Sequence, residues 1–347
     1  MENPTNINIE KKLKRKEFNL FDSAIACCMF IVLQLFMSLL IGVLPSSLKS
    51  SFTIAFLVSF LVEAVFFFSV LITSSYRRVE FVNATKMNGK TDILSILLAV
   101  AISFVCLFCF TGLTNTFVSV LYKLGYSSDA SISVPNAFVY VVYIFLICIC
   151  PAFFEDLLFR GCVLSGLRGL GDKKAVILSA LIFMLMHGGP DQTIHQFVIG
   201  IVLGAAFIAS NSVWIPVIIH FVNNFVALTA AFITRNLPVA EVEILTWGQI
   251  FLQFAYAIIS AIVGVYLVYF CVIGLKELRL KRERESVKTE ENEIGTETES
   301  LEKDSIINEK TIDMKSKNEK KITIIAFSLV GAYLIINWVL ALIAGLI

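Results

Sequence analysis

The sequence reads AFVYVVYIFLICICPAFFEDLLFRG from Ala137 to Gly161. A helix needs about 20 consecutive apolar residues to cross the roughly 30 Å hydrocarbon core of a bilayer. Residues 137–158 reach this length, and Glu155 and Asp156 are their only charged residues. We therefore predict a membrane helix that carries two carboxylates within the bilayer or close to its surface, where ionisable groups are costly.

The composition of the whole chain is that of a membrane protein. Of its 347 residues, 57% are hydrophobic and 16% are charged, which is not typical of a soluble domain. The sequence predicts an all-α fold, a polytopic transmembrane helical bundle with eight or nine membrane helices. The apolar runs lie at 22–44, 52–74, 93–113, 137–158, 175–187, 195–210, 213–233, 250–275 and 322–347. The fifth and sixth are short and flank the helix-breaking sequence 188–191.

The distribution of Lys and Arg predicts how the chain lies in the membrane. Basic clusters precede the first run and follow the second, fourth and eighth runs. Because basic short loops stay in the cytoplasm, we expect a multi-pass plasma membrane protein with a cytoplasmic N-terminus and an extracytoplasmic C-terminus. The Ile-, Lys-, Asn- and Phe-rich composition favours a bacterial membrane, and nucleic acid is not an expected partner.

The eight cysteines are expected to be structural. They lie almost wholly within apolar runs, where free Cys behaves as a small hydrophobic residue. No paired CxxC modules occur, so neither a disulfide nor a metal framework is indicated.

Polar residues inside the apolar runs are the candidates for function, because they are costly there unless they face the bundle interior or water. These residues are Glu63, Glu155, Asp156, Arg160, His187, His195, His220, Asn223 and Asn224.

Helical spacing sorts these candidates. Asp156 and Arg160 are four residues apart, so they share a helix face and can neutralise each other. Glu155 then points about 100° away from Asp156, so its carboxylate is available for another interaction. His220 and Asn224 are also four residues apart and present an imidazole beside an amide.

The estimated depths of three of these residues in the membrane allow their side chains to meet. A helical rise of 1.5 Å per residue places Glu155, His187 and His220 at roughly 18, 20 and 12 Å from the cytoplasmic face. A carboxylate and two imidazoles that meet in a partly wet cavity can activate water, with or without a metal ion.

At these residues the sequence resembles the CPBP family of intramembrane proteases, which comprises CaaX proteases and bacteriocin-processing enzymes. The resemblance rests on four motifs that occur in order on successive runs: Glu155-Asp156-x-x-x-Arg160-Gly161, Phe183-x-x-x-His187, Phe197-x-x-Gly200-x-x-x-Gly204 and His220-x-x-x-Asn224. It covers 155–224, and the flanking residues add membrane helices without a diagnostic match.

The resemblance implies a role for each matched residue. Glu155 would match the catalytic glutamate that polarises water, and Arg160 the structural arginine. His187 and His220 would match the essential histidines, and Asn224 the amide that supports the oxyanion. The family usually has a second Glu where this chain has Asp156, which leaves the role of the second acid open.

The sequence leaves the cofactor open between Zn²⁺ and none. Glu155, His187 and His220 are a sufficient zinc set, and the family is commonly labelled metalloprotease. The HExxH spacing is absent, and a metal-free glutamate-activated water is the alternative.

The remaining polar and small residues have plainer interpretations. Glu63 is typical of an interhelical hydrogen-bonding partner or a cavity-lining group, and His195 of an interfacial histidine. Gly200 and Gly204 form a small-xxx-small pair that lets helices pack closely. Asn223 is expected to serve packing.

The domain organisation follows from these assignments. We expect a tail and three membrane helices in 1–136, a CPBP-like catalytic core in 137–233, the eighth helix in 234–275 and the last in 322–347. The highly charged segment 276–321 lacks the large apolar residues needed to fold alone. Its start can continue helix eight, and the rest is predicted to be a disordered cytoplasmic tether.

The resemblance implies an intramembrane endopeptidase that cleaves a membrane-associated peptide or protein, in CaaX-type processing or in bacteriocin maturation and self-immunity. A catalytically silent scaffold or immunity protein is the alternative, and the intact set of costly polar residues argues against it. A proton-relaying transporter is disfavoured because no inverted repeat is evident.

Overall fold

The computed structural model describes residues 15–49, 51–128, 133–237, 244–294 and 309–346. These residues are mainly helical, and within them the only β-type pairing is an isolated bridge between Arg15 and Val79. The α-helices are α1 (Leu20–Val43), α2 (Ser46–Lys49), α3 (Phe52–Tyr76), α4 (Phe81–Ala84), α5 (Ile93–Val105), α6 (Thr111–Lys123), α7 (Ala137–Tyr143), α8 (Cys150–Asp156), α9 (Ser165–Leu167), α10 (Asp172–Met186), α11 (Thr193–Ser210), α12 (Trp214–Thr234), α13 (Trp247–Ile294) and α14 (Glu309–Leu346).

Three π-helical segments join these helices into longer rods. They are Cys106–Phe110 between α5 and α6, Ile144–Ile149 between α7 and α8, and Leu157–Leu164 between α8 and α9. As a result, 93–123 and 137–170 each form one continuous rod. Because π-helical turns concentrate at functional sites, the two that flank α8 draw attention to Glu155 and Asp156.

Eight helices in the described residues are long and apolar enough to cross a membrane. The predicted all-α bundle of eight or nine membrane helices is confirmed, and the chain is a multi-pass membrane protein. The fifth predicted run, 175–187, became α10, which has 15 residues and rises only about 22 Å. His187, directly after α10, therefore lies inside the bundle instead of at its far surface.

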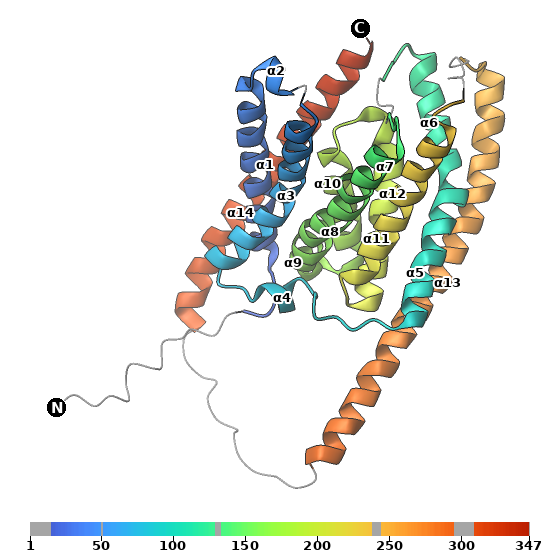
Figure 1. Cartoon of the computed structure of the whole chain (residues 1–347). Coiled ribbons are helices and arrows are strands. Elements are labelled where there is room, and N and C mark those ends of the chain that lie inside the picture. The colour runs from blue at the N-terminus through green and yellow to red at the C-terminus, as the bar shows by residue number, and fades with distance from the viewer. Residues whose placement is uncertain (1–14, 50, 129–132, 238–243, 295–308, 347) are drawn as a thin grey trace.

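The helices form three groups side by side, with α8 to α12 in the centre (Figure 1). On one side of this centre lie α1, α3 and α14, and on the other lie α5, α6 and α13 (Figure 1). Among the fully buried large side chains of the core are Phe159, Phe183 and Ile219. Apart from Glu63 of α3, the polar candidates lie in this centre, which the two other groups flank (Figure 1).

The charged segment 276–321 differs in part from the sequence prediction. Its start continues α13 as a helix to Ile294, with ion pairs at four-residue spacing such as Arg279–Glu283 at 3.6 Å. Its end is also helical, because α14 begins at Glu309, well before the predicted boundary at 322. Such i,i+4 pairs support a helix without a buried face. The predicted disorder of 295–308 lies outside the described residues.

A buried carboxylate fixes the start of α1. Asp22 is fully buried and accepts from Arg15 Nη2 at 2.9 Å and from Arg77 Nε at 2.7 Å. It also completes a capping box with Asn19, and Arg77 reaches Glu319 at 3.2 Å. This network ties the first residues described to the end of α3 and the start of the apolar part of α14.

Candidate active site

The two carboxylates predicted from the sequence lie at the end of α8, between two π-helical segments. Glu155 and Asp156 are both buried, with 6% and 0% of their surface exposed. The helix continues through Pro151 to the end of α9. The rod therefore carries both acids into the protein interior, and each of them faces a different histidine.

Glu155 faces His187 across a short gap. The distance from Glu155 Oε2 to His187 Nε2 is 3.8 Å, too long for a direct hydrogen bond. Glu155 Oε2 is buried without a hydrogen-bond partner among the described residues. A water molecule lying beside this line can contact both atoms, so the gap has the dimensions of a water site.

The imidazole of His187 is held by the helix that precedes it. Its Nδ1 lies 2.8 Å from the carbonyl oxygen of Phe183, and a carbonyl only accepts, so Nδ1 carries the proton. Nε2 is then the atom presented to Glu155. The ring also packs edge-on against Phe183, with centroids 4.5 Å apart, which fixes its orientation.

Asp156 links an arginine to the second histidine. Its Oδ1 lies 2.8 Å from Arg160 Nη1, which confirms the ion pair predicted from the four-residue spacing. Its Oδ2 lies 3.3 Å from His220 Nδ1, a contact that spacing along one helix does not reveal. Since a carboxylate only accepts, His220 donates from Nδ1, and its Nε2 is directed away from Asp156.

The guanidinium of Arg160 is also fully enclosed. Arg160 is 1% exposed, and its Cζ lies 4.3 Å from the centroid of the Phe183 ring, a cation–π distance. Phe183 therefore touches Arg160, His187 and His220 at once, the last at a centroid distance of 6.2 Å. The aromatic ring of the Phe-x-x-x-His motif is the common wall of the site.

The Asn224 side chain bonds to the rod that carries Glu155. Its Nδ2 donates to the carbonyl oxygen of Ile147 at 2.9 Å. Four residues after Ile147 the chain has Pro151, which lacks the N–H that an α-helix would supply there. One N–H of the amide is used in this way, and the other remains for a ligand. Neighbouring Asn223 instead donates to its own helix, at Ile219 O.

Two further polar candidates lie near this constellation. Glu63 interacts electrostatically with Glu155, and its Oε2 is buried without a partner among the described residues. His195, in the first turn of α11, interacts electrostatically with both His187 and His220.

The glycine pair of α11 serves close packing. A Cβ at Gly200 would lie 3.0 Å from Ala180 Cβ, and one at Gly204 would lie 3.0 Å from Leu164 Cδ1. This confirms the small-xxx-small interpretation. Close approach of α11 to α10 keeps the chain around His187 in place.

A zinc site needs at least three converging ligands. Among the residues described, no group of three His, Cys, Asp or Glu side chains has the arrangement of a metal site. Glu155 and His187 approach each other, while Asp156 holds Nδ1 of His220 and leaves its Nε2 as the ring nitrogen for a ligand. The zinc set that the sequence left open therefore does not have the arrangement of a metal site in this geometry. All eight cysteines are free thiols, in agreement with their structural interpretation.

Comparison with known proteins assigns the centre of the bundle. Residues 137–226 match the family model described as "Type II CAAX prenyl endopeptidase Rce1-like". The match covers the region that carries the four motifs, and it supports membership of the CPBP family. The Rce1-like region contains all of the contacts described above between Glu155, Asp156 and the two histidines. No curated protein and no solved structure matches the chain.

Proposed function

We propose that the chain is an intramembrane endopeptidase that hydrolyses a peptide bond of a membrane-associated peptide or protein. The observation that carries this proposal is the 3.8 Å gap between Glu155 Oε2 and His187 Nε2, together with the unpartnered state of that buried oxygen. A buried carboxylate without a donor is costly, and a bound water supplies the missing hydrogen bond.

In the first step Glu155 takes a proton from this water. The water oxygen bonds to the scissile carbonyl carbon, and the carbonyl oxygen becomes an oxyanion. His187 Nε2 accepts a hydrogen bond from the second water proton and so aims the oxygen lone pair. Positioned general bases of this kind contribute about 10²–10⁴-fold to a rate.

The oxyanion is stabilised from α12. The second N–H of the Asn224 amide donates to it, and His220, oriented by Asp156 through Nδ1, presents Nε2 to the reacting atoms for proton transfer. Removal of one such donor costs about 10²–10³-fold in other acyl-transfer enzymes. Glu155 then returns its proton to the leaving nitrogen as the C–N bond breaks, which restores the carboxylate.

The family supplies the substrate class. We infer either CaaX-type processing of a prenylated protein or maturation of a membrane-associated peptide, at a plasma membrane, with the N-terminus cytoplasmic. A prenylated CaaX peptide and an unprenylated membrane-tethered peptide, assayed side by side, distinguish the two substrates.

The test uses the full chain, purified and reconstituted in vesicles, with a membrane-tethered fluorogenic peptide. Glu155→Gln is expected to lower the cleavage rate by about 10²–10⁴-fold and to leave folding intact, because no hydrogen bond to Oε2 is lost. Asn223→Ala is the matched control, since the side-chain hydrogen bond of Asn223 among the described residues stays within its own helix. Cleavage by Glu155→Gln within tenfold of the unchanged protein would refute the mechanism and favour a catalytically silent scaffold.

A further inference from the structure

A groove with a volume of about 530 Å³ lies between α10, α11 and α13, away from the candidate active site. It lies at the end of the bundle where α10 begins and where α11 ends. Its basic lining residues are Arg168, Lys173, Lys276 and Arg279, and its single acidic lining residue is Asp172. The groove therefore carries a positive charge.

Two of these four basic residues are already partnered. Arg168 Nε pairs with Asp172 at 2.9 Å, and Arg279 lies 3.6 Å from Glu283. Within the described residues, neither Lys173 nor Lys276 has an ion pair or a hydrogen bond, and both are exposed. These two ammonium groups are available for an anionic ligand.

The rest of the groove is apolar. Val176 and Ile177 of α10 and Val272 of α13 form its walls, and Ala205 of α11 lies between them. Ile177 is 47% exposed within a membrane-embedded bundle, so this wall faces lipid. A small residue between two larger walls leaves a channel that runs from the basic end along the helices.

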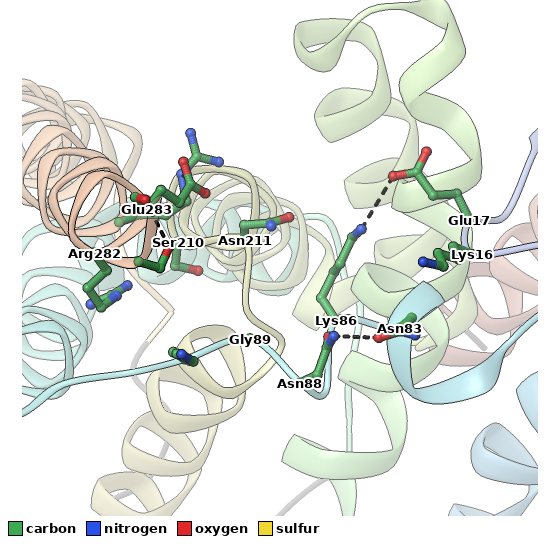
Figure 2. Close-up of a pocket in the computed structure, with 13 residues that line it drawn as sticks. Lys16, Glu17, Asn83, Lys86, Asn88, Gly89, Ser210, Asn211, Arg282 and Glu283 are labelled. Carbon is green, nitrogen blue, oxygen red and sulfur yellow. Dashed lines mark hydrogen bonds and ion pairs between the residues drawn. The ribbon is translucent and has the colours of Figure 1, made fainter. Parts of the chain in front are cut away.

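A second cleft at the same end of the molecule provides a comparison. It lies between Lys86, Gly89, Asn211 and Arg282 and has a volume of about 420 Å³ (Figure 2). Figure 2 shows Lys86 directed at Glu17, a 3.4 Å ion pair, and Arg282 pairs with Asp92. The residues that line this cleft are polar or charged apart from Gly89, so it has no wall of large apolar side chains.

We propose that the groove between α10, α11 and α13 binds one anionic phospholipid. Its phosphate lies at the basic end against Lys173 and Lys276, and one acyl chain lies along Ile177, Ala205 and Val272. Basic residues near a membrane surface attract anionic lipids, and buried CH₂ groups add the affinity of the chain. The basic end alone or the apolar walls alone would not indicate a lipid. Together in one groove they match a molecule with a charged headgroup and an apolar chain.

The test titrates the full-length protein in detergent with phosphatidylglycerol, phosphatidylcholine or inorganic phosphate, and counts bound molecules by native mass spectrometry. We expect one phosphatidylglycerol to bind, phosphatidylcholine to bind several-fold more weakly, and inorganic phosphate not to bind. Because each Lys near an anionic headgroup contributes about fivefold in affinity, Lys173→Gln with Lys276→Gln is expected to weaken phosphatidylglycerol binding about 25-fold.

The matched control is Lys16→Gln with Lys90→Gln, which removes the same charge from residues that line the second cleft. This control is expected to bind phosphatidylglycerol within twofold of the unchanged protein. Ala205→Phe fills the channel and is expected to abolish tight lipid binding while both lysines remain. Equal binding of the two lipids, equal weakening in both double variants, or tight binding of phosphate alone would each overturn the proposal.

Discussion

Substitution of Asp156 by asparagine tests whether the second acid of the motif orients a catalytic histidine. The carboxylate lies between Arg160 Nη1 at 2.8 Å and His220 Nδ1 at 3.3 Å, and all three residues are buried. The Asp156→Asn change keeps the shape of the side chain but removes its charge. Breaking a buried ion pair on one side costs about 3–5 kcal/mol, so we expect a marked fall in thermal stability. Loss of an oriented His220 lowers general acid–base catalysis by about 10²–10⁴-fold.

The assay must separate the two effects. Cleavage is measured per folded molecule, after size-exclusion chromatography and below the unfolding transition of the variant, and kcat is expected to fall with KM little changed. Asp156→Glu is the matched control, because it keeps the charge and is the residue usual in this family. We expect it to retain activity within about tenfold. A folded Asp156→Asn protein with the kcat of the unchanged chain would show that Asp156 is only structural.

Three further outcomes are expected. Among the described residues no third metal ligand joins Glu155 and His187. The cleavage rate after dialysis against a chelator should therefore stay within twofold of the rate before it. A loss of activity that added Zn²⁺ restores would contradict this prediction. Asp22→Asn should lower the unfolding free energy by about 3 kcal/mol, measured in a denaturant titration, because two arginines lose their buried partner. Gly200→Leu should lower the unfolding free energy by about 1–3 kcal/mol or more through overpacking against Ala180, and should also lower the cleavage rate by shifting α10. An unchanged unfolding midpoint for Asp22→Asn or for Gly200→Leu would refute the argument for that variant.

Most of the fold follows from the sequence because hydrophobic length is a direct physical requirement of the bilayer. The runs at 22–44, 52–74 and 213–233 match α1, α3 and α12 closely. Helix ends outside the apolar runs were harder to predict. The sequence allowed the eighth helix to continue into the charged segment, but the end of α13 at Ile294 depends on charged pairs along a solvated face, which composition alone does not locate.

The site was predictable where one helix decides the geometry. Four-residue spacing gave the pairing of Asp156 with Arg160, and helical rise gave the similar depths of Glu155 and His187. The contact of Asp156 with His220 depends on how α8 packs against α12, which local spacing does not encode. The hydrogen bond from the Asn224 amide to Ile147 O also depends on tertiary packing, which the local sequence does not encode.

Two neighbouring carboxylates on one helix can serve two histidines only if those histidines approach from different sides. Side chains of consecutive residues diverge by about 100° on a helix, so Glu155 meets His187 from the end of α10 while Asp156 meets His220 from α12. This arrangement requires α10 to end within the bundle, which its 15-residue length ensures. A longer α10 would carry His187 past the level of Glu155. The short helix α10, which decides whether eight or nine membrane helices are counted, therefore also brings His187 to Glu155 in the candidate active site.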